Sequence, residues 1–135
     1  MHFEWKKELE TGVPALDSHH QGIFYCINDF FQKCDKGGGT EEISVLFDLL
    51  DSYTRKHFHY EETLQKFNDY PGLDEQQKQH ALFLADLAEL KRSLEINGPT
   101  KELNLITKGK LIRWLSHHIK SLDKEFVDFL KAKRH

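Results

Sequence analysis

Four segments with helical periodicity constrain the fold of this chain. Apolar residues recur at steps of three and four in each segment, and no run alternates apolar and polar residues as a strand would. We expect helices over 17–35, 40–68, 74–97 and 100–131, with Asp17 or Ser18 capping the first. Glycine- and proline-containing turns separate them. Because short connections make successive helices antiparallel, the sequence predicts an all-α, up-down-up-down four-helix bundle.

The length of the chain favours a single domain. Its 135 residues suit one compact unit, which can bury enough apolar surface to form a core without disulfides or other cross-links. Residues 17–135 are expected to form the bundle. Residues 1–16 are expected to form an irregular N-terminal arm, held on the bundle by Phe3, Trp5, Val13 and Leu16.

Charge and composition argue against two classes of partner. The 19 basic and 22 acidic residues give a formal net charge of -3, whereas nucleic acids and anionic membranes select a clustered basic surplus. No apolar run is long enough to span a bilayer, and the N-terminus lacks the apolar stretch of a signal peptide. Cys26 and Cys34 lie eight residues apart in one expected helix, roughly 12 Å and too far for a disulfide. We therefore expect core thiols and a reducing, cytoplasmic location.

Each of the four apolar stripes carries a histidine where an apolar residue is expected. These are His20, His57, His80 and His118, from a total of nine histidines in the chain. One buried histidine is usually a satisfied core residue, but four, one per helix, suggest a shared role. Burying four imidazoles without partners would be costly, and a metal would take their lone pairs. Histidine with carboxylate favours iron, manganese or zinc, and the lack of nearby cysteine ligands argues against a structural zinc site.

Two acidic residues follow these histidines in the sequence, one at a spacing of four residues and one at a spacing of five. Glu61 follows His57 by four residues, so both side chains point to one site, where a carboxylate can bind two metals through its two oxygens. Asp123 follows His118 by five residues, about 140° around an α-helix, so periodicity alone places it on the solvated surface. His19, His59 and His117 lie beside the stripes and are expected at the surface or as hydrogen-bond partners of the ligands.

Motifs along almost the whole chain match one family. They are Trp5 and Gly12-Val13 in the arm, Leu16-Asp17-Ser18-His19-His20, His57-Phe58-His59-Tyr60-Glu61-Glu62, Tyr70-Pro71, His80 with Phe83, and Trp114-Leu115-Ser116-His117-His118-Ile119-Lys120-Ser121-Leu122-Asp123. In these motifs and their order, the sequence closely resembles the bacterial hemerythrins.

The resemblance implies a pair of non-haem iron ions bridged by an oxygen atom and two carboxylates. Glu61 and Asp123 would be the bridging carboxylates, which reverses the surface interpretation of Asp123. His20 and His57 would bind the iron that keeps an open position for O2, and His80 and His118 would bind the second iron. The expected O2 pocket is lined by Leu115, Trp114 and Ile23. Leu115 resembles the family's apolar residue beside O2, and an apolar wall there would keep water out.

One residue departs from the family pattern. The family has a further histidine on the second iron, four residues before the one that matches His80, and this chain has Gln76 there. Three interpretations follow: Gln76 ligates weakly through its amide oxygen, water fills the position, or the second iron is loosely bound and easily lost. The ligand set also suits manganese or a mixed metal pair.

The leading functional hypothesis is reversible binding of O2, or a similar diatomic molecule, for storage, delivery or sensing. No general base for further chemistry is evident, which favours a binding protein over an enzyme. One alternative is that Gln76 opens the second iron to oxidase, peroxidase or NO-reducing chemistry. Another is a regulatory module in which metal or O2 occupancy changes a partner surface. The sequence does not identify a protein partner.

Overall fold

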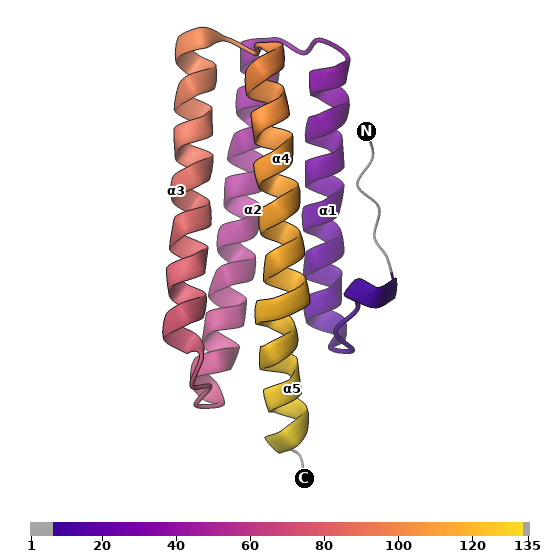
Figure 1. The fold of residues 1–135 in the computed structure, drawn as a ribbon, viewed down its shortest axis with the longest axis vertical. Coiled ribbons are helices and arrows are strands. Elements are labelled where there is room, and N and C mark those ends of the chain that lie inside the picture. Colours follow the sequence, from indigo (N-terminus) through magenta and orange to yellow (C-terminus); the bar gives the residue numbers. More distant parts are fainter. Residues whose placement is uncertain (1–6, 134–135) are drawn as a thin grey trace.

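The computed structural model describes residues 7–133. A short 3-10 helix, η1 (Lys7–Leu9), precedes α1 (Pro14–Asp35), α2 (Thr40–Phe67), α3 (Leu73–Asn97) and α4 (Lys101–His117). A π-helical turn, η2 (His118–Asp123), then leads into α5 (Lys124–Lys133). Figure 1 shows α4 and α5 as one continuous rod that lies alongside α1, α2 and α3. The described residues contain no strand, so the predicted all-α architecture is confirmed.

The order of the helices around the bundle follows their order in the chain. α1 packs on α2, α2 on α3, α3 on α4, and α4 closes the ring against α1. The turns after α1 and after α3 lie at one end of the bundle, and the turn after α2 lies at the other (Figure 1). This is the up-down-up-down topology that short connections predict.

Two apolar clusters fill the interior and leave a polar layer between them. The larger contains Ile23 of α1, Leu50 of α2, Phe83 of α3 and Leu115 of α4, together with most other buried apolar residues. The smaller consists of Leu16, Phe126 and Val127, with Val13 packed against it. Along α1, His20 lies between Leu16 of the small cluster and Ile23 of the large one. The histidines therefore occupy a layer that apolar residues enclose from both ends of the bundle.

The N-terminal arm is shorter than expected. α1 begins at Pro14 rather than at Asp17, because proline fits the first turn of a helix, where its missing N–H needs no partner. Asp17 is consequently inside the helix and does not cap it. Its carboxylate accepts hydrogen bonds from the backbone N–H groups of Thr11 (2.8 Å) and Gly12 (3.2 Å). Gly12 has φ +87°, a conformation that glycine adopts without strain, and this turn folds the arm back onto α1.

The apolar residues of the arm and the two cysteines were also predicted from the sequence. Leu16 is fully buried, as expected, whereas Phe3 and Trp5 lie outside the described residues. Cys26 and Cys34 are both free thiols, as expected. Within residues 7–133, no helix has the length and apolar character that crossing a bilayer requires.

The last helix departs from the single α-helix that periodicity predicts over 100–131. It begins after Thr100, whose hydroxyl accepts a hydrogen bond from the N–H of Leu103 (3.1 Å) as an N-cap. Between His118 and Asp123 the chain adopts a π-helical turn, in which backbone hydrogen bonds join residues five apart. That wider turn brings residues separated by five positions to one side of the helix.

Candidate metal centre

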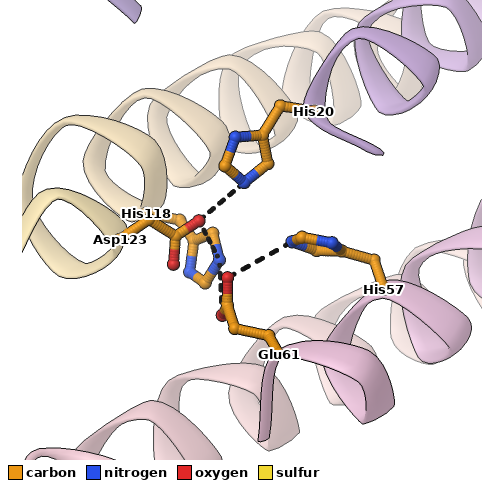
Figure 2. A group of neighbouring side chains, drawn as sticks. All are labelled: His20, His57, Glu61, His118 and Asp123. Carbon is orange, nitrogen blue, oxygen red and sulfur yellow. Dashed lines mark ion pairs between the residues drawn. The ribbon is translucent and has the colours of Figure 1, made fainter. Parts of the chain in front are cut away.

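Five buried side chains converge in the polar layer. His20, His57, Glu61, His118 and Asp123 each offer a donor atom, and these atoms all lie within 4.8 Å of one another. Figure 2 shows the five side chains pointing toward a common centre from three separate stretches of helix. At most 1% of any of them is exposed. Three of the four predicted histidine ligands and both predicted carboxylates are thus brought together.

Glu61 joins the fourth predicted histidine to this group. Its Oε2 atom lies 3.5 Å from Nε2 of His57, in the same helix. Its Oε1 atom lies 3.0 Å from Nε2 of His80 and 3.3 Å from Nε2 of His118. The two oxygens of one carboxylate therefore face different histidines.

Asp123 lies in the centre because of the π-helical turn. Its Oδ2 atom is 2.6 Å from Nε2 of His20 and 3.0 Å from Nε2 of His118. Its Oδ1 atom accepts a hydrogen bond from the amide Nε2 of Gln76, 3.3 Å away. The surface position that α-helical periodicity predicts for Asp123 is wrong, because η2 moves the residue onto the inner face beside His118.

Unpaired polar atoms test whether a metal fits this group. Ten buried side-chain nitrogen and oxygen atoms of the described residues have no hydrogen-bond partner, and eight of these belong to predicted ligands: His20, His57, Glu61, Gln76, His118 and Asp123. Even the 2.6 Å approach of His20 to Asp123 lacks hydrogen-bond geometry. Buried polar atoms of native proteins are rarely left unpaired. A cation at the centre would satisfy the lone pairs that face it, those of Nε2 of the histidines and of the carboxylate oxygens, so the site fits a metal of the imidazole- and carboxylate-binding kind.

A second ring of contacts orients two of the histidines. Nδ1 of His80 lies 2.7 Å from Oε2 of Glu62. Nδ1 of His57 lies 3.1 Å from Nδ1 of His19. In both cases the partner occupies the outer nitrogen and leaves Nε2 facing the centre, which is the arrangement that metal-binding histidines usually have. His59 and His117 are exposed, and His19 is a partner of a predicted ligand, as the sequence suggested.

Glu61 and His118 shift the pKa of each other in opposite directions. Burial raises the pKa of Glu61, but the charge of His118 and the polar contacts of the surrounding histidines outweigh burial and hold that pKa well below its usual value. For His118, burial lowers the pKa, but the carboxylates of Asp123 and Glu61 outweigh it and raise the pKa to about 10. Glu61 thus remains anionic, which favours a cation beside it.

Aromatic rings cover the side of the centre that carries His80 and His118. Phe58 stacks on His80 with 3.8 Å between ring centroids, and Trp114 stacks on His118 with 4.7 Å. Leu115 and Ile23, two of the predicted pocket residues, are fully buried in the larger cluster. The third, Trp114, is partly buried and covers His118. That these three line an O2 pocket stays a prediction.

Two residues near the centre are not predicted by the sequence pattern: Gln65, which is buried, and Glu62, which contacts His80. The apolar residue that follows Glu61 by three positions is Leu64, but the fully buried residue is Gln65, four positions after Glu61. The step of four that links His57 to Glu61 could have found it. Glu62 carried no signal except its place beside Glu61 in the matched motif.

Comparison with known proteins agrees with this geometry. The family model described as the Hemerythrin HHE cation binding domain matches residues 11–130. A bacteriohemerythrin of Pseudomonas paraeruginosa (strain PA7) is 29% identical over 130 residues, 96% of this chain and 82% of that protein. A myohemerythrin of Riftia pachyptila is 29% identical over 121 residues, 90% of this chain and 88% of that protein. The similarity covers the arm from residue 11 and all of α1 to α4.

Proposed function

Because the chain belongs to the hemerythrin family, we propose that it holds two non-haem iron ions in the polar layer and binds O2 there reversibly. The observation that carries this proposal is the convergence of five buried ligand side chains whose donor atoms lie within 4.8 Å of one another. When bound, the iron pair supplies the electrons with which O2 is held. The protein supplies the ligands, their orientation and a dry surrounding.

The contacts support a specific division of the ligands. His20 and His57 would hold the iron with the open position, and His80 and His118 would hold the second. Glu61 would be shared between the two, since its Oε2 faces His57 while its Oε1 faces His80 and His118. Asp123 would be the second shared carboxylate, since its Oδ2 lies near both His20 and His118.

The apolar clusters exclude water from the open position. Leu115 and Ile23 are fully buried and belong to the apolar layer that adjoins the histidines. They form the dry wall beside bound O2, while Trp114 covers His118 on the side of the second iron. Excluding water there slows proton entry, and with it the irreversible loss of reduced oxygen.

Gln76 favours one alternative function. It occupies the position of the family's further histidine, is 1% exposed and has an unpaired Oε1 atom. An amide oxygen is a weaker donor than an imidazole, so this position leaves the second iron more open. Oxidase, peroxidase or NO-reducing chemistry at that iron is the competing proposal.

Location and partners follow from coarser observations. Two free thiols, Cys26 and Cys34, fit a reducing compartment, and we place the protein in the cytoplasm. O2 is the ligand that the family membership supports. The net charge of -3 gives no support to a nucleic-acid partner.

The test is anaerobic loading with ferrous ion, followed by metal analysis and an absorption spectrum before and after air. Two irons per chain and an absorption band that appears with O2 and disappears on its removal support O2 binding. Two irons with irreversible bleaching support the oxidase alternative. A chain that holds no iron contradicts both.

The neighbouring histidines His117 and His118 provide a matched control. His118 is buried in the centre and His117 is exposed on the same helix. Replacement of His118 by alanine should abolish the oxygen-dependent band, whereas His117→Ala should leave iron content and spectrum unchanged. Circular dichroism of both variants confirms that the helices are retained.

A further inference from the structure

Gln65 presents a buried polar group that the iron ligands do not explain. It is fully buried on α2, and neither its Oε1 nor its Nε2 atom has a hydrogen-bond partner. Among residues 7–133, it is the one residue with unpaired buried atoms that is not a predicted ligand. A metal at the centre would engage the inward-facing donor atoms of the other six residues, whereas both atoms of this amide would stay without partners.

The register of α2 and α3 places Gln65 beside Gln76. Glu61 and His80 face each other across these antiparallel helices, with 3.0 Å between Oε1 and Nε2. One turn onward along α2 leads to Gln65, and one turn back along α3 leads to Gln76. Both steps go toward the turn that connects the two helices. The helix register therefore points both amides toward the same end of the centre, where Gln76 contacts Asp123.

The hydrogen bonds of Gln76 leave three free polar atoms at that end of the centre. Its Nε2 donates to Oδ1 of Asp123, which turns its Oε1 away from that bond. The unpaired atoms are then the carbonyl oxygen of Gln76 and the oxygen and nitrogen of Gln65. An ordered internal water typically makes about three hydrogen bonds to such otherwise unpaired groups.

We propose that Gln65 and Gln76 form an amide pocket that holds a water molecule, and that this water is the exchangeable ligand of the second iron. The water donates to the two amide carbonyls, and one lone pair remains for the metal. The metal-binding role of the water rests on the proposed diiron function, but its presence in the pocket does not. Exchange of this water makes the second iron accessible to a small anion, for which azide is a suitable probe.

The first measurement uses the metal-free full-length chain. In 15N-labelled protein, the side-chain amide protons of Gln65 and Gln76 are assigned by their loss in Gln65→Met and Gln76→Met. Cross-peaks between water and both amide groups, of the sign expected for a long-lived water, support the pocket. Amides that contact only each other overturn it. Gln32, exposed on α1, serves as the control for an amide with rapidly exchanging water.

The second measurement counts azide in the iron-loaded protein. The wild-type chain should bind two azide ions, and Gln76→His, which fills the position with an imidazole, should bind one. Gln65→Met should lower the affinity for the second azide ion about tenfold, which corresponds to the loss of one hydrogen bond. One azide in both the wild type and Gln76→His overturns the exchangeable ligand.

Iron content separates this inference from the proposed function. A chain that does not take up two irons contradicts the diiron function, and the metal-free measurement still decides whether the amides hold water. A chain with two irons that binds a single azide, unaffected by Gln76→His, refutes the exchangeable ligand and leaves the diiron function intact.

Discussion

Oδ2 of Asp123 lies 3.0 Å from Nε2 of His118, although five residues separate the two along the chain. The intervening turn is π-helical, and its hydrogen bonds join residues five apart, so both side chains face the same centre. A regular α-helix would turn them about 140° apart. The geometry of one turn therefore decides whether the centre has one carboxylate or two.

Asp123→Asn should remove the second bridging ligand with little change of shape. The neutral amide offers one oxygen donor in place of two anionic ones, so the variant should hold fewer than two irons per chain. Replacing a hydrogen-bond partner of a metal ligand typically lowers metal affinity by roughly 10–100-fold, and we expect a larger loss here because a ligand itself is changed. Chelator competition after ferrous loading measures it. Asp128→Asn, at an exposed aspartate of α5, is the control and should keep both irons.

Glu62→Gln should weaken iron binding at the second position without touching a ligand. Oε2 of Glu62 accepts from Nδ1 of His80, which keeps Nε2 of that ring directed at the centre. A neutral acceptor holds the ring less firmly, and we expect about a tenfold lower affinity for the second iron. Competition with a graded chelator series measures this. Glu41→Gln, at an exposed position of the same helix, should have no effect. Equal affinities for Glu62→Ala and the wild type would refute the orienting role.

Periodicity predicts residues that share a face of a regular helix, and its failures here have local causes. It placed His20, His57, His80 and His118 on the inner stripes, because a step of three or four keeps a side chain on one face. It does not predict the position of Asp123, because the residues between His118 and Asp123 contain no sequence signal for a π-helical turn. Resemblance to the family supplied that residue. The helix was predicted to begin at Asp17 because aspartate is a common N-cap, whereas it begins at Pro14.

The buried amide of Gln65 shows a different limit of sequence reasoning. Glutamine side chains are mostly exposed in proteins, so an apolar stripe on α2 is expected to include the neighbouring residue Leu64 rather than Gln65. The structure buries Gln65 completely and leaves Leu64 partly exposed. Polar groups in a core are stable only with partners, and those partners depend on the opposite helix, which the sequence of α2 does not contain.

Gln76→His should slow the autoxidation of the oxygen-loaded protein. A full imidazole is a stronger donor than an amide or a water and leaves no room for solvent at the second iron. We expect a severalfold decrease in the rate at which the oxygen-dependent band decays in air. The comparison requires equal iron content in both proteins. Equal decay rates would show that Gln76 does not open the centre.

Cys34 should react slowly with iodoacetamide at pH 8. Burial raises the pKa of this thiol to about 11, from 9.0, with a smaller opposing effect of Lys108. Since the thiolate is the nucleophile, the shift alone lowers the reactive fraction about a hundredfold. The rate should rise with pH toward about 11, and unfolding in urea should remove the protection. Mass spectrometry of Cys26→Ser, which leaves Cys34 as the one thiol, follows the reaction. Equal rates in folded and unfolded protein would contradict the burial.

The same shift has a consequence for stability against pH. The folded-state pKa of Cys34 lies above the unfolded value, so the folded state retains a proton that the unfolded state loses. Its contribution to stability is complete below about pH 9 and is lost as the pH rises to about 11. Cys34→Ser should therefore lose less stability than the wild type between these two values in urea titrations.

Metal removal should lower the melting temperature, because iron binds the folded centre and the unfolded chain has no such site. At free ferrous ion a thousandfold above the dissociation constant, the linkage amounts to about 4 kcal/mol. For a domain of this size we expect a rise of about 10 °C or more on loading. Anaerobic calorimetry with and without ferrous ion measures it. Mg²⁺, which prefers an all-oxygen shell, is the matched control and should not shift the transition. A melting temperature that is independent of ferrous ion would mean that the buried histidines and carboxylates do not act together as a metal site.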